Sequence, residues 1–413
     1  MTRRVVITGL GAVTPVGIGV KSFWHALRDG VPGIGEITLF DASAHPCRIA
    51  AEVRGFEPRD FMSPKAAVTR GRFSLFGVAA ARMAYEDAGL ASLGRRSRVA
   101  VCFGNSAIAI SEVQNGIEQF SRHGTTTVSP SIALEAASHA VTGHISADLS
   151  LKGQTMTLAT ACSTGIDVVQ WAFQQIRSGL VDGVLAGASE TPLSSYSQAT
   201  FSALGVLSRW PGPPAQALRP FDAMSDGLVL GEGAGAFVVE ELQHARARGA
   251  HTYAEVLGFG SASEGINLRT VDPTGAALQS AARLALRMAR LDASAIDHVN
   301  AHGNGLPDYD RAETAAYRSV FGRHAYNVPV SSIKPVTGQS LAAAGALQVV
   351  AACFTLQEQF VPPTLNHDLP HPECDLDYVP NHGRTARVSR LLVAAHAMGG
   401  THSALILGLP TEN

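Results

Sequence analysis

Several kinds of residue and segment are scarce in this 413-residue chain, and each scarcity excludes a class of protein. The five cysteines are widely spaced and form no Cys-x-x-Cys pair, so we expect neither a disulfide framework nor a metal site. The net charge is only −2, so no overall field favours nucleic acid. The most apolar segment, residues 340–356, is short and contains Gln348, which favours a core helix over a membrane span. These features predict an ordinary globular protein in the reducing cytoplasm.

The N-terminus lacks the features of two familiar leader segments. Glycines and Pro15 interrupt the apolar run after Arg3 and Arg4, which argues against a signal peptide. The GLG that follows does not complete the dinucleotide-binding pattern, so no such cofactor is expected. We predict a strand over residues 4–8 and a tight turn in GLGAVTPVG.

The remainder of the chain alternates strand and helix patterns, which predicts a layered α/β fold. Residues 98–104, 155–161 and 183–189 resemble short buried strands, and 73–89 resembles a helix closed by glycine. The long glycine- and proline-rich loop 205–235 is expected to be functional. From residue 252 the alternation starts again. We therefore divide the chain into an N-terminal half, 1–250, and a C-terminal half, 251–413.

Cys162 is the strongest candidate nucleophile. It lies where the predicted strand 155–161 gives way to an amphipathic helix. Unpaired N–H groups and the positive end of the helix dipole would favour a thiolate there, and a backbone N–H would help to bind an oxyanion. The alternative on this stretch alone is a buried structural cysteine.

The C-terminal half offers two further polar clusters at predicted strand ends. His302 ends the strand in IDHVNAHG, the usual place for active-site groups in parallel α/β sheets. Lys334 and Gln339 lie between a strand and the apolar segment 340–356. Each residue taken singly is more often structural than catalytic, but their joint placement favours a site.

Five motifs together resemble the β-ketoacyl-ACP synthases of the thiolase superfamily, especially those of type II fatty-acid and polyketide systems. They are TACSTG at Cys162, NAHG at His302, DRAE ending at Glu313, SSIKPVTG at Lys334 and MGGTHSA from Met398. The likeness covers nearly the whole chain. It implies a five-layered αβαβα fold made of two similar halves, a dimer, and an acyl carrier protein as partner. No cofactor is implied beyond the phosphopantetheine that the carrier protein brings.

The resemblance also implies roles for individual residues. Cys162 would accept the acyl chain as a thioester, and His302 would be the first of two histidines that promote decarboxylation of a malonyl extender. Gln339 stands where the family has the second histidine, and glutamine can donate a hydrogen bond but carries no charge. Lys334 and Glu313 match a buried ion pair that orders the site.

Other positions match or depart from the family pattern. Asn304 and Leu306 replace threonines that hydrogen-bond the carrier arm, so recognition of this arm is expected to differ. Met398 stands at the gate of the acyl pocket, which Ile108 and Phe201 would line and which we expect to admit more than an acetyl group. His396 and His402 are unusual beside Met398. One alternative is that His402 partly replaces the missing histidine, but a supporting or structural role is favoured, because nothing in its spacing shows that it reaches Cys162. Basic residues on a segment like the family's docking helix would meet an acidic carrier protein: Lys65, Arg70 and Arg72.

Three functions are compatible with these features. The first is a condensing enzyme that elongates a polyketide or fatty acyl chain. The second is a non-decarboxylating acyltransferase that passes the acyl group to an oxygen, nitrogen or sulfur nucleophile. The third is a non-catalytic partner similar to a chain-length factor, which the presence of Cys162 disfavours. The dimer would be a homodimer or a heterodimer with a ketosynthase-like subunit.

Overall fold

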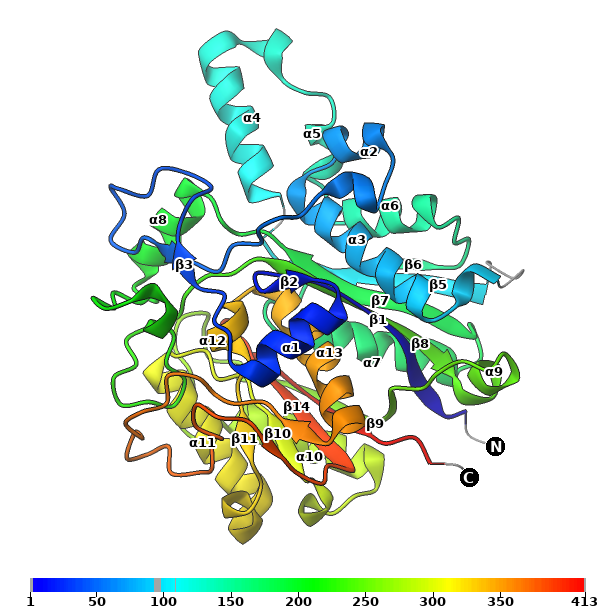
Figure 1. Cartoon of the computed structure of the whole chain (residues 1–413), viewed down its shortest axis with the longest axis vertical. Helices are drawn as coiled ribbons and strands as arrows, with labels where there is room; N and C mark the ends of the chain where they lie inside the picture. Colours follow the sequence, from blue (N-terminus) through cyan, green and yellow to red (C-terminus); the bar gives the residue numbers. More distant parts are fainter. Residues whose placement is uncertain (1–2, 93–97, 108, 412–413) are drawn as a thin grey trace.

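Two sets of five strands with the same internal order form the framework of the protein (Figure 1). The computed structural model describes residues 3–92, 98–107 and 109–411. The strands of the first set, in the order β6-β5-β7-β8-β1, are β1 (Val5–Thr14), β5 (Val99–Gly104), β6 (Thr155–Leu158), β7 (Gly183–Glu190) and β8 (Gly233–Glu241). Those of the second, in the order β11-β10-β14-β15-β9, are β9 (Ala254–Ser263), β10 (His298–Asn300), β11 (Val330–Ser331), β14 (Arg390–His396) and β15 (Thr401–Gly408).

The two sets share one pattern of strand directions. In each set the strand next to the outer edge is parallel to both its neighbours, and the remaining pairs are antiparallel. Antiparallel pairing of β1 with β9 joins the sets through only two residue pairs, Val6 with Glu255 and Ile7 with Ala254. The predicted boundary at residues 250 and 251 falls between the last helix of the first set and β9, and it stays a prediction.

Helices form three layers around these strands. The main ones are α3 (Arg72–Asp87), α6 (Ala140–Asp148), α7 (Thr164–Arg177), α10 (Ala276–Ala289), α11 (Pro307–Phe321) and α13 (Ala342–Glu358). The pair α7 and α13 lies between the two sets and contacts strands of both. The pair α3 and α6 covers the outer face of the first set, while α10 covers β9 and β15 on the outer face of the second and packs on α11. The expected five-layered αβαβα fold is confirmed.

Further helices and short strands connect the layers or extend from them. The helices are α1 (Val20–Asp29), α2 (Pro64–Thr69), α4 (Ile110–His123), α5 (Ile132–Glu135), α8 (Ser195–Leu204), α9 (Leu242–Ala247) and α12 (Lys334–Thr337). The strands are β2 (Gly17–Ile18), β3 (Gly35–Glu36), β4 (Ile49–Ala50), β12 (Phe360–Val361) and β13 (Arg384–Thr385). Among the described residues, no helix is both long enough and apolar enough to span a bilayer.

Two sequence predictions about strands were wrong. The GLG after residue 8 is not a turn but part of β1, which is buried along its whole length. Glycine is needed there because a Cβ on Gly9 or Gly11 would lie 2.2 or 2.0 Å from a backbone oxygen of α3. The strand before Cys162 is not fully buried, because β6 is the edge strand of its set and Thr155 is exposed.

Candidate active site

Cys162 lies at the junction between β6 and α7, immediately before the N-cap residue Ser163. The preceding Ala161 has a left-handed backbone with φ of 50°, a conformation that is costly for a residue with a side chain and common at functional sites. The Cys162 side chain is buried in an apolar cluster that also includes Phe201 and Met398. This junction therefore holds the sulfur in a fixed, water-excluded position.

Burial is the main influence on the pKa of the Cys162 thiol. Burial raises the pKa of the Cys162 thiol to about 11, although the Lys334 ammonium and the backbone N–H of Met398 oppose this rise. The backbone N–H groups and the Lys334 charge favour the thiolate, as expected at the N-terminal end of a helix, but desolvation outweighs them. The N–H groups of Met398 and of Cys162 itself point to the sulfur, where an oxyanion would form during acyl transfer.

His302 follows the C-terminal end of β10 and is fully enclosed by protein. Lys334 lies beside its ring, with Nζ 3.4 Å from His302 Nδ1, and also donates to the His302 carbonyl. Burial, followed by the Lys334 charge, lowers the pKa of His302 well below its usual value. The imidazole is therefore neutral. Because an ammonium has only donors, Nδ1 accepts and the proton lies on Nε2.

Glu313 and Lys334 support His302 from two sides. Glu313 accepts hydrogen bonds from the backbone N–H of His302 at 2.6 Å and of Gly303 at 2.8 Å. The expected direct ion pair between Lys334 and Glu313 is wrong, since these two described side chains are separated by the His302 backbone that each of them binds. Burial lowers the pKa of Lys334 to about 8, although Glu313 partly compensates for the desolvation.

Gln339 joins the nucleophile to the histidine. Its Nε2 atom lies 3.6 Å from Cys162 Sγ and 3.5 Å from His302 Nε2. The side chain is fully buried, and its Oε1 atom has no hydrogen-bond partner in the part of the chain that the structure describes. Two N–H donors, from His302 Nε2 and Gln339 Nε2, therefore converge next to the sulfur.

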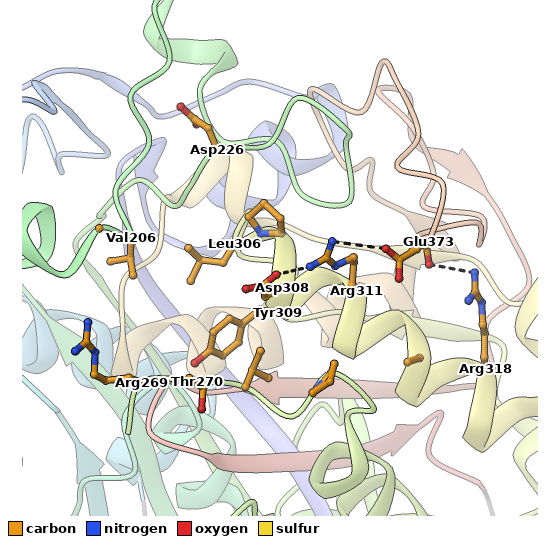
Figure 2. Close-up of a pocket in the computed structure, with 15 residues that line it drawn as sticks. Val206, Asp226, Arg269, Thr270, Leu306, Asp308, Tyr309, Arg311, Arg318 and Glu373 are labelled. Atoms are coloured by element: carbon orange, nitrogen blue, oxygen red, sulfur yellow. Dashed lines mark hydrogen bonds and ion pairs between the residues drawn. The ribbon is translucent and has the colours of Figure 1, made fainter. Parts of the chain in front are cut away.

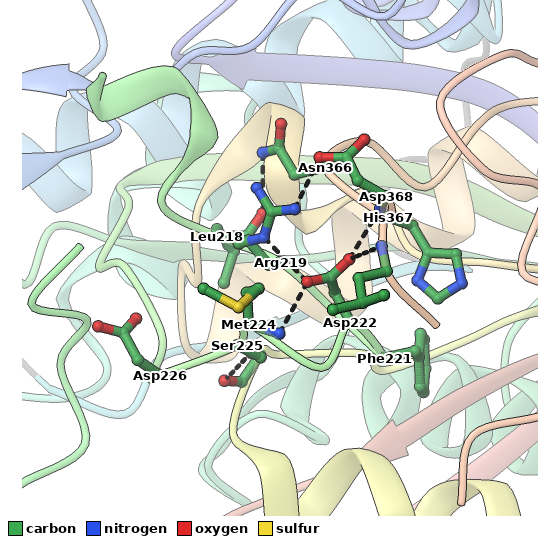
Figure 3. A network of polar contacts seen from close by, with 12 residues as sticks. Leu218, Arg219, Phe221, Asp222, Met224, Ser225, Asp226, Asn366, His367 and Asp368 are labelled. Atoms are coloured by element: carbon green, nitrogen blue, oxygen red, sulfur yellow. Dashed lines mark hydrogen bonds and ion pairs between the residues drawn. The ribbon is translucent and has the colours of Figure 1, made fainter. Parts of the chain in front are cut away.

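The long loop 205–232 supports the site through a network around Asp222 (Figure 3). Asp222 pairs with Arg219 at 3.1 Å and accepts the backbone N–H groups of Asp368 and Leu369, both at 2.7 Å. In the same loop, Phe221 stacks on Tyr378 with ring centroids 4.0 Å apart. A Cβ on Gly303 would lie 2.8 Å from the Phe221 ring. The loop thus packs directly against the backbone next to His302.

A surface cleft of about 770 Å³ lies next to the site, on the side of Asn304 and Leu306 (Figure 2). Figure 2 shows Tyr309 and Thr270 in the middle of this cleft, Arg269 on one side, and Arg311 and Arg318 on the other. Leu306 lines the cleft, while Asn304 is buried below and accepts the Leu306 N–H at 3.0 Å. No sequence motif pointed to Tyr309, which is buried and whose pKa is raised to about 12 by burial, with smaller contributions from Glu264 and Cys162.

The residues predicted to line the acyl pocket or to bind the carrier protein lie in different surroundings. Phe201 and Met398 share the Cys162 cluster, whereas Ile108 lies outside the described residues. Lys65 is exposed on α2, but Arg70 and Arg72 are engaged within the chain. Arg70 bonds both oxygens of Asp148 at 2.7 Å, and Arg72 bonds the buried Glu232 at 2.6 and 2.8 Å. The docking role of this segment stays a prediction, which now depends on Lys65.

The hydrogen bond of His402 is made away from Cys162 and His302, although its electrostatic effect helps to lower the pKa of His302. His402 is buried, and its Nε2 lies 3.0 Å from Glu264 Oε1. Burial and the neighbouring His396 lower the pKa of His402 to about 3, so this imidazole is neutral. Glu264 was not singled out in the sequence, because it lies in a polar segment without a motif.

Comparison with known proteins matches both halves of the chain to domains of a single protein family. Residues 2–245 match the N-terminal domain of beta-ketoacyl synthases, and residues 253–368 match the C-terminal domain. A putative polyketide beta-ketoacyl synthase 1 of Streptomyces cyaneus is 39% identical over 419 residues, which cover 99% of either chain.

Solved structures give the same result. The ishigamide ketosynthase/chain length factor superposes with a TM-score of 0.92 at 32% identity, covering 100% of both chains. A type II polyketide synthase acyl-carrier protein in complex with its hexaketide-bound ketosynthase includes a chain that superposes with a TM-score of 0.91 at 30% identity. This match covers 99% of the present chain and 100% of the other.

Proposed function

Because this chain belongs to the beta-ketoacyl synthase family, we propose that it takes an acyl group from an acyl carrier protein onto Cys162 and condenses it with a malonyl-type extender. The reaction belongs to polyketide or fatty-acid biosynthesis. The observation that carries the assignment of roles is that Gln339 Nε2 lies within 3.6 Å of the Cys162 sulfur and 3.5 Å of His302 Nε2. Nucleophile and hydrogen-bond donors thus share one buried site.

In the loading step, Cys162 Sγ attacks the carrier thioester. The new carbon–sulfur bond forms as the bond to the pantetheine sulfur breaks, and the thiol proton passes to the departing pantetheine sulfur. Charge on the carbonyl oxygen is held by the backbone N–H groups of Cys162 and Met398. Because these donors are backbone groups in a buried site, they need no rearrangement as charge develops.

In the condensing step, the bond between the malonyl carboxylate carbon and the neighbouring carbon breaks. CO₂ leaves, and the electron pair of this bond forms an enolate on the remaining thioester. We assign the enolate oxygen to the two donors His302 Nε2–H and Gln339 Nε2–H, which are 3.5 Å apart. The enolate carbon then attacks the acyl carbonyl on Cys162, and the cysteine sulfur leaves and recovers a proton. Lys334 and Glu313 act as positioning residues, since they fix the tautomer of His302 and its backbone.

The carrier's phosphopantetheine arm is proposed to enter through the cleft of Figure 2. Tyr309 connects this cleft to the neighbourhood of Cys162. Leu306 in its wall offers the arm an apolar contact where a threonine would offer a hydroxyl. No cofactor of the chain's own enters the mechanism, because the pantetheine belongs to the carrier protein.

The proposal also covers the binding partners of the protein and its location in the cell. One similar structure is a ketosynthase in complex with its acyl-carrier protein, and another is a ketosynthase/chain length factor. We infer that this chain binds a carrier protein and dimerises with itself or with a ketosynthase-like subunit in the cytoplasm.

The proposal is tested by intact-protein mass spectrometry after incubation with acyl-carrier protein, followed by addition of malonyl-carrier protein. We expect an acyl adduct on the wild type that is consumed to give a β-ketoacyl product. Cys162→Ala should give neither signal. Cys47→Ala is the matched control, since Cys47 is a buried cysteine of the same apolar cluster, and it should keep the adduct.

Two results would contradict parts of this proposal. An adduct of equal yield on Cys162→Ala would remove the nucleophile assignment. Transfer of the acyl group from Cys162 to an alcohol or amine, with no decarboxylation of malonyl-carrier protein, would replace condensation by the acyltransferase alternative, which the neutral Gln339 favours.

A further inference from the structure

Three side chains that the condensing mechanism does not use meet at one end of the second strand set. His396 ends β14, His402 lies at the start of β15, and Glu264 follows the end of β9. His396 and His402 are direct cross-strand partners, and β15 is hydrogen-bonded to β9. The strand register therefore brings two imidazoles and one carboxylate together without any contribution from the Cys162 site.

The donor atoms of these residues are closely spaced. Glu264 Oε1 lies 3.0 Å from His402 Nε2 and 3.9 Å from His396 Nε2, and one potential ligand atom from each residue lies within 4.8 Å of the others. The imidazole centroids are 4.3 Å apart at an interplanar angle of 72°. All three side chains are almost completely buried.

Hydrogen bonds within the protein leave this cluster incomplete. Among the described residues, neither the ring nitrogens of His396 nor Glu264 Oε2 have a hydrogen-bond partner, and all three atoms are buried. A buried polar atom without a partner costs on the order of 1–3 kcal/mol. The one shared contact, between His402 and Glu264, satisfies neither His396 nor the second carboxylate oxygen. These atoms therefore indicate a ligand that accepts lone pairs from nitrogen and oxygen.

We propose that Glu264, His396 and His402 bind one divalent transition-metal ion, for which Zn²⁺ is the best-suited probe. Two imidazoles and one carboxylate are a donor set typical of zinc, whereas Mg²⁺ and Ca²⁺ prefer oxygen ligands. Three protein ligands leave one position of a tetrahedron for water or another small ligand. This site is separate from the cysteine, which lies outside the group of ligand atoms.

The ion would stabilise the turn that carries Met398. This turn, residues 397–401, connects the two histidines, and Gly399 and Gly400 in it have left-handed φ values of 91° and 79°. The Glu264 N–H already donates to the Gly400 carbonyl at 2.9 Å. A metal ion held by both strands and by Glu264 would therefore restrict the turn and fix the Met398 N–H that faces the Cys162 sulfur.

Metal binding is tested on the purified, metal-stripped full chain by titration with ZnCl₂ against a chromophoric chelator. We expect one equivalent per chain, with affinity reduced at least about 100-fold in Glu264→Gln, His396→Gln and His402→Asn, by comparison with the 10- to 100-fold losses known for residues that only support ligands. His123→Ala, which removes an exposed histidine of α4, and Cys162→Ala should both keep the full affinity. Circular dichroism of each variant checks that it is folded.

Two further measurements identify the type of metal ligand and test whether the metal stabilises the 397–401 turn. Co²⁺ should give visible d–d bands without a thiolate charge-transfer band, which separates this site from one at a cysteine. Hydrogen exchange should show slower exchange of the 397–401 amides with Zn²⁺ in the wild type and no change in His396→Gln. Absence of stoichiometric binding to the wild type, or full affinity in folded His396→Gln and His402→Asn, would overturn the proposal.

Discussion

At the scale of single residues, the chemistry of the site depends on what a glutamine amide can and cannot do. Gln339 Nε2 faces both the sulfur and His302, so it is placed to hold a developing oxyanion. An amide stabilises this charge only through its dipole, because it can neither become positively charged nor exchange a proton at neutral pH. Its Oε1 atom, buried without a partner, adds a repulsive oxygen to the same environment. In the proposed mechanism, loading does not use this residue, whereas decarboxylation does.

The first residue-scale prediction concerns Gln339→His. Removing an oxyanion donor typically costs on the order of 10²- to 10³-fold in rate, and glutamine should recover only part of this effect. We expect the wild type to load Cys162 readily but to decarboxylate malonyl-carrier protein slowly. Gln339→His should raise decarboxylation by about tenfold or more, within that range, without changing the loading rate. CO₂ release and the rate of adduct formation are the two measurements.

A matched control for this prediction is Gln339→Ala, which removes the amide and should lower decarboxylation further while loading continues. If Gln339→His changes nothing and the wild type already condenses at the rate of its most active relatives, the enolate oxygen is held by a different donor.

The residues of the site were largely predictable from local motifs, but their energetics were not. Cys162, His302 and Gln339 come together as the motifs implied. The helix end favours a thiolate at Cys162 but burial outweighs it, and Lys334 and Glu313 interact across the His302 backbone that both of them bind. Neither result could be read from the motifs, because burial and the course of the His302 backbone depend on tertiary packing. Similarly, Arg70 and Arg72 resemble surface charges in the sequence, and only the fold reveals their partners Asp148 and Glu232.

At the scale of elements, the position of Cys162 depends on close contact between α7 and α13. Gly165 in the first turn of α7 faces the backbone of α13, where a Cβ would lie 2.0 Å from Ala346 N and 2.6 Å from Gly345 C. These atoms belong to a buried helix backbone, which cannot rotate away as a flexible side chain would. Glycine is therefore required at residue 165 for packing rather than for backbone flexibility.

The element-scale prediction is that Gly165→Ala destabilises the protein by about 1–3 kcal/mol, the usual cost of overpacking a core. It should also slow acylation of Cys162, because α7 must shift away from α13. Urea unfolding and the loading assay measure these effects. Gly143→Ala in α6 is the control, since a Cβ there meets no atom within 4 Å. This variant should be neutral or slightly more stable, and equal losses in both variants would contradict the packing argument.

A second element-scale prediction concerns α2 as the docking helix. Lys65 is the one of the three predicted basic residues that is not held in an internal ion pair. Lys65→Glu should slow loading from acyl-carrier protein about two- to five-fold at low salt, since an exposed pair contributes about 0.5–1 kcal/mol. The effect should fade as salt rises. Lys21→Glu, which changes an exposed lysine of α1, should leave the rate unchanged, and an unchanged rate in Lys65→Glu would place docking elsewhere.

Element types were more predictable than element boundaries. The patterns at 73–89, 98–104 and 183–189 correspond to α3, β5 and β7. The pattern failed at GLG in β1, because glycines that admit a neighbouring helix resemble glycines that make a turn. The need for these glycines becomes clear only when α3 is seen packed against them. Because α3 is formed by residues more than 60 positions farther along the chain, a local sequence pattern cannot reveal this contact.

At the scale of the whole molecule, α4 is attached to the layered body through its first turns, where Glu112 accepts the Arg72 N–H at 2.6 Å and Ser111 donates to the Leu193 carbonyl at 3.3 Å. Figure 1 shows α4 extending away from the layered body. Its residues Ile117 and Phe120, which are 60% and 50% exposed, lie three positions apart and so share one helix face. Leu134 in the following α5 is 68% exposed. Exposed apolar side chains grouped in this way favour an interface.

The whole-molecule prediction is that Ile117→Asp combined with Phe120→Asp converts a dimer to a monomer. Light scattering after size exclusion should give the wild type twice the 43.1 kDa chain mass and the double variant the single mass. Central apolar anchors cost on the order of 2 kcal/mol each when lost, so the dissociation constant should rise about 10³-fold. Leu180→Asp, which changes an equally exposed leucine outside α4 and α5, should remain dimeric. A wild type that is monomeric alone, but pairs with a ketosynthase-like subunit through the same face, would make the interface heteromeric, whereas a dimer that persists in the double variant would exclude α4 from it.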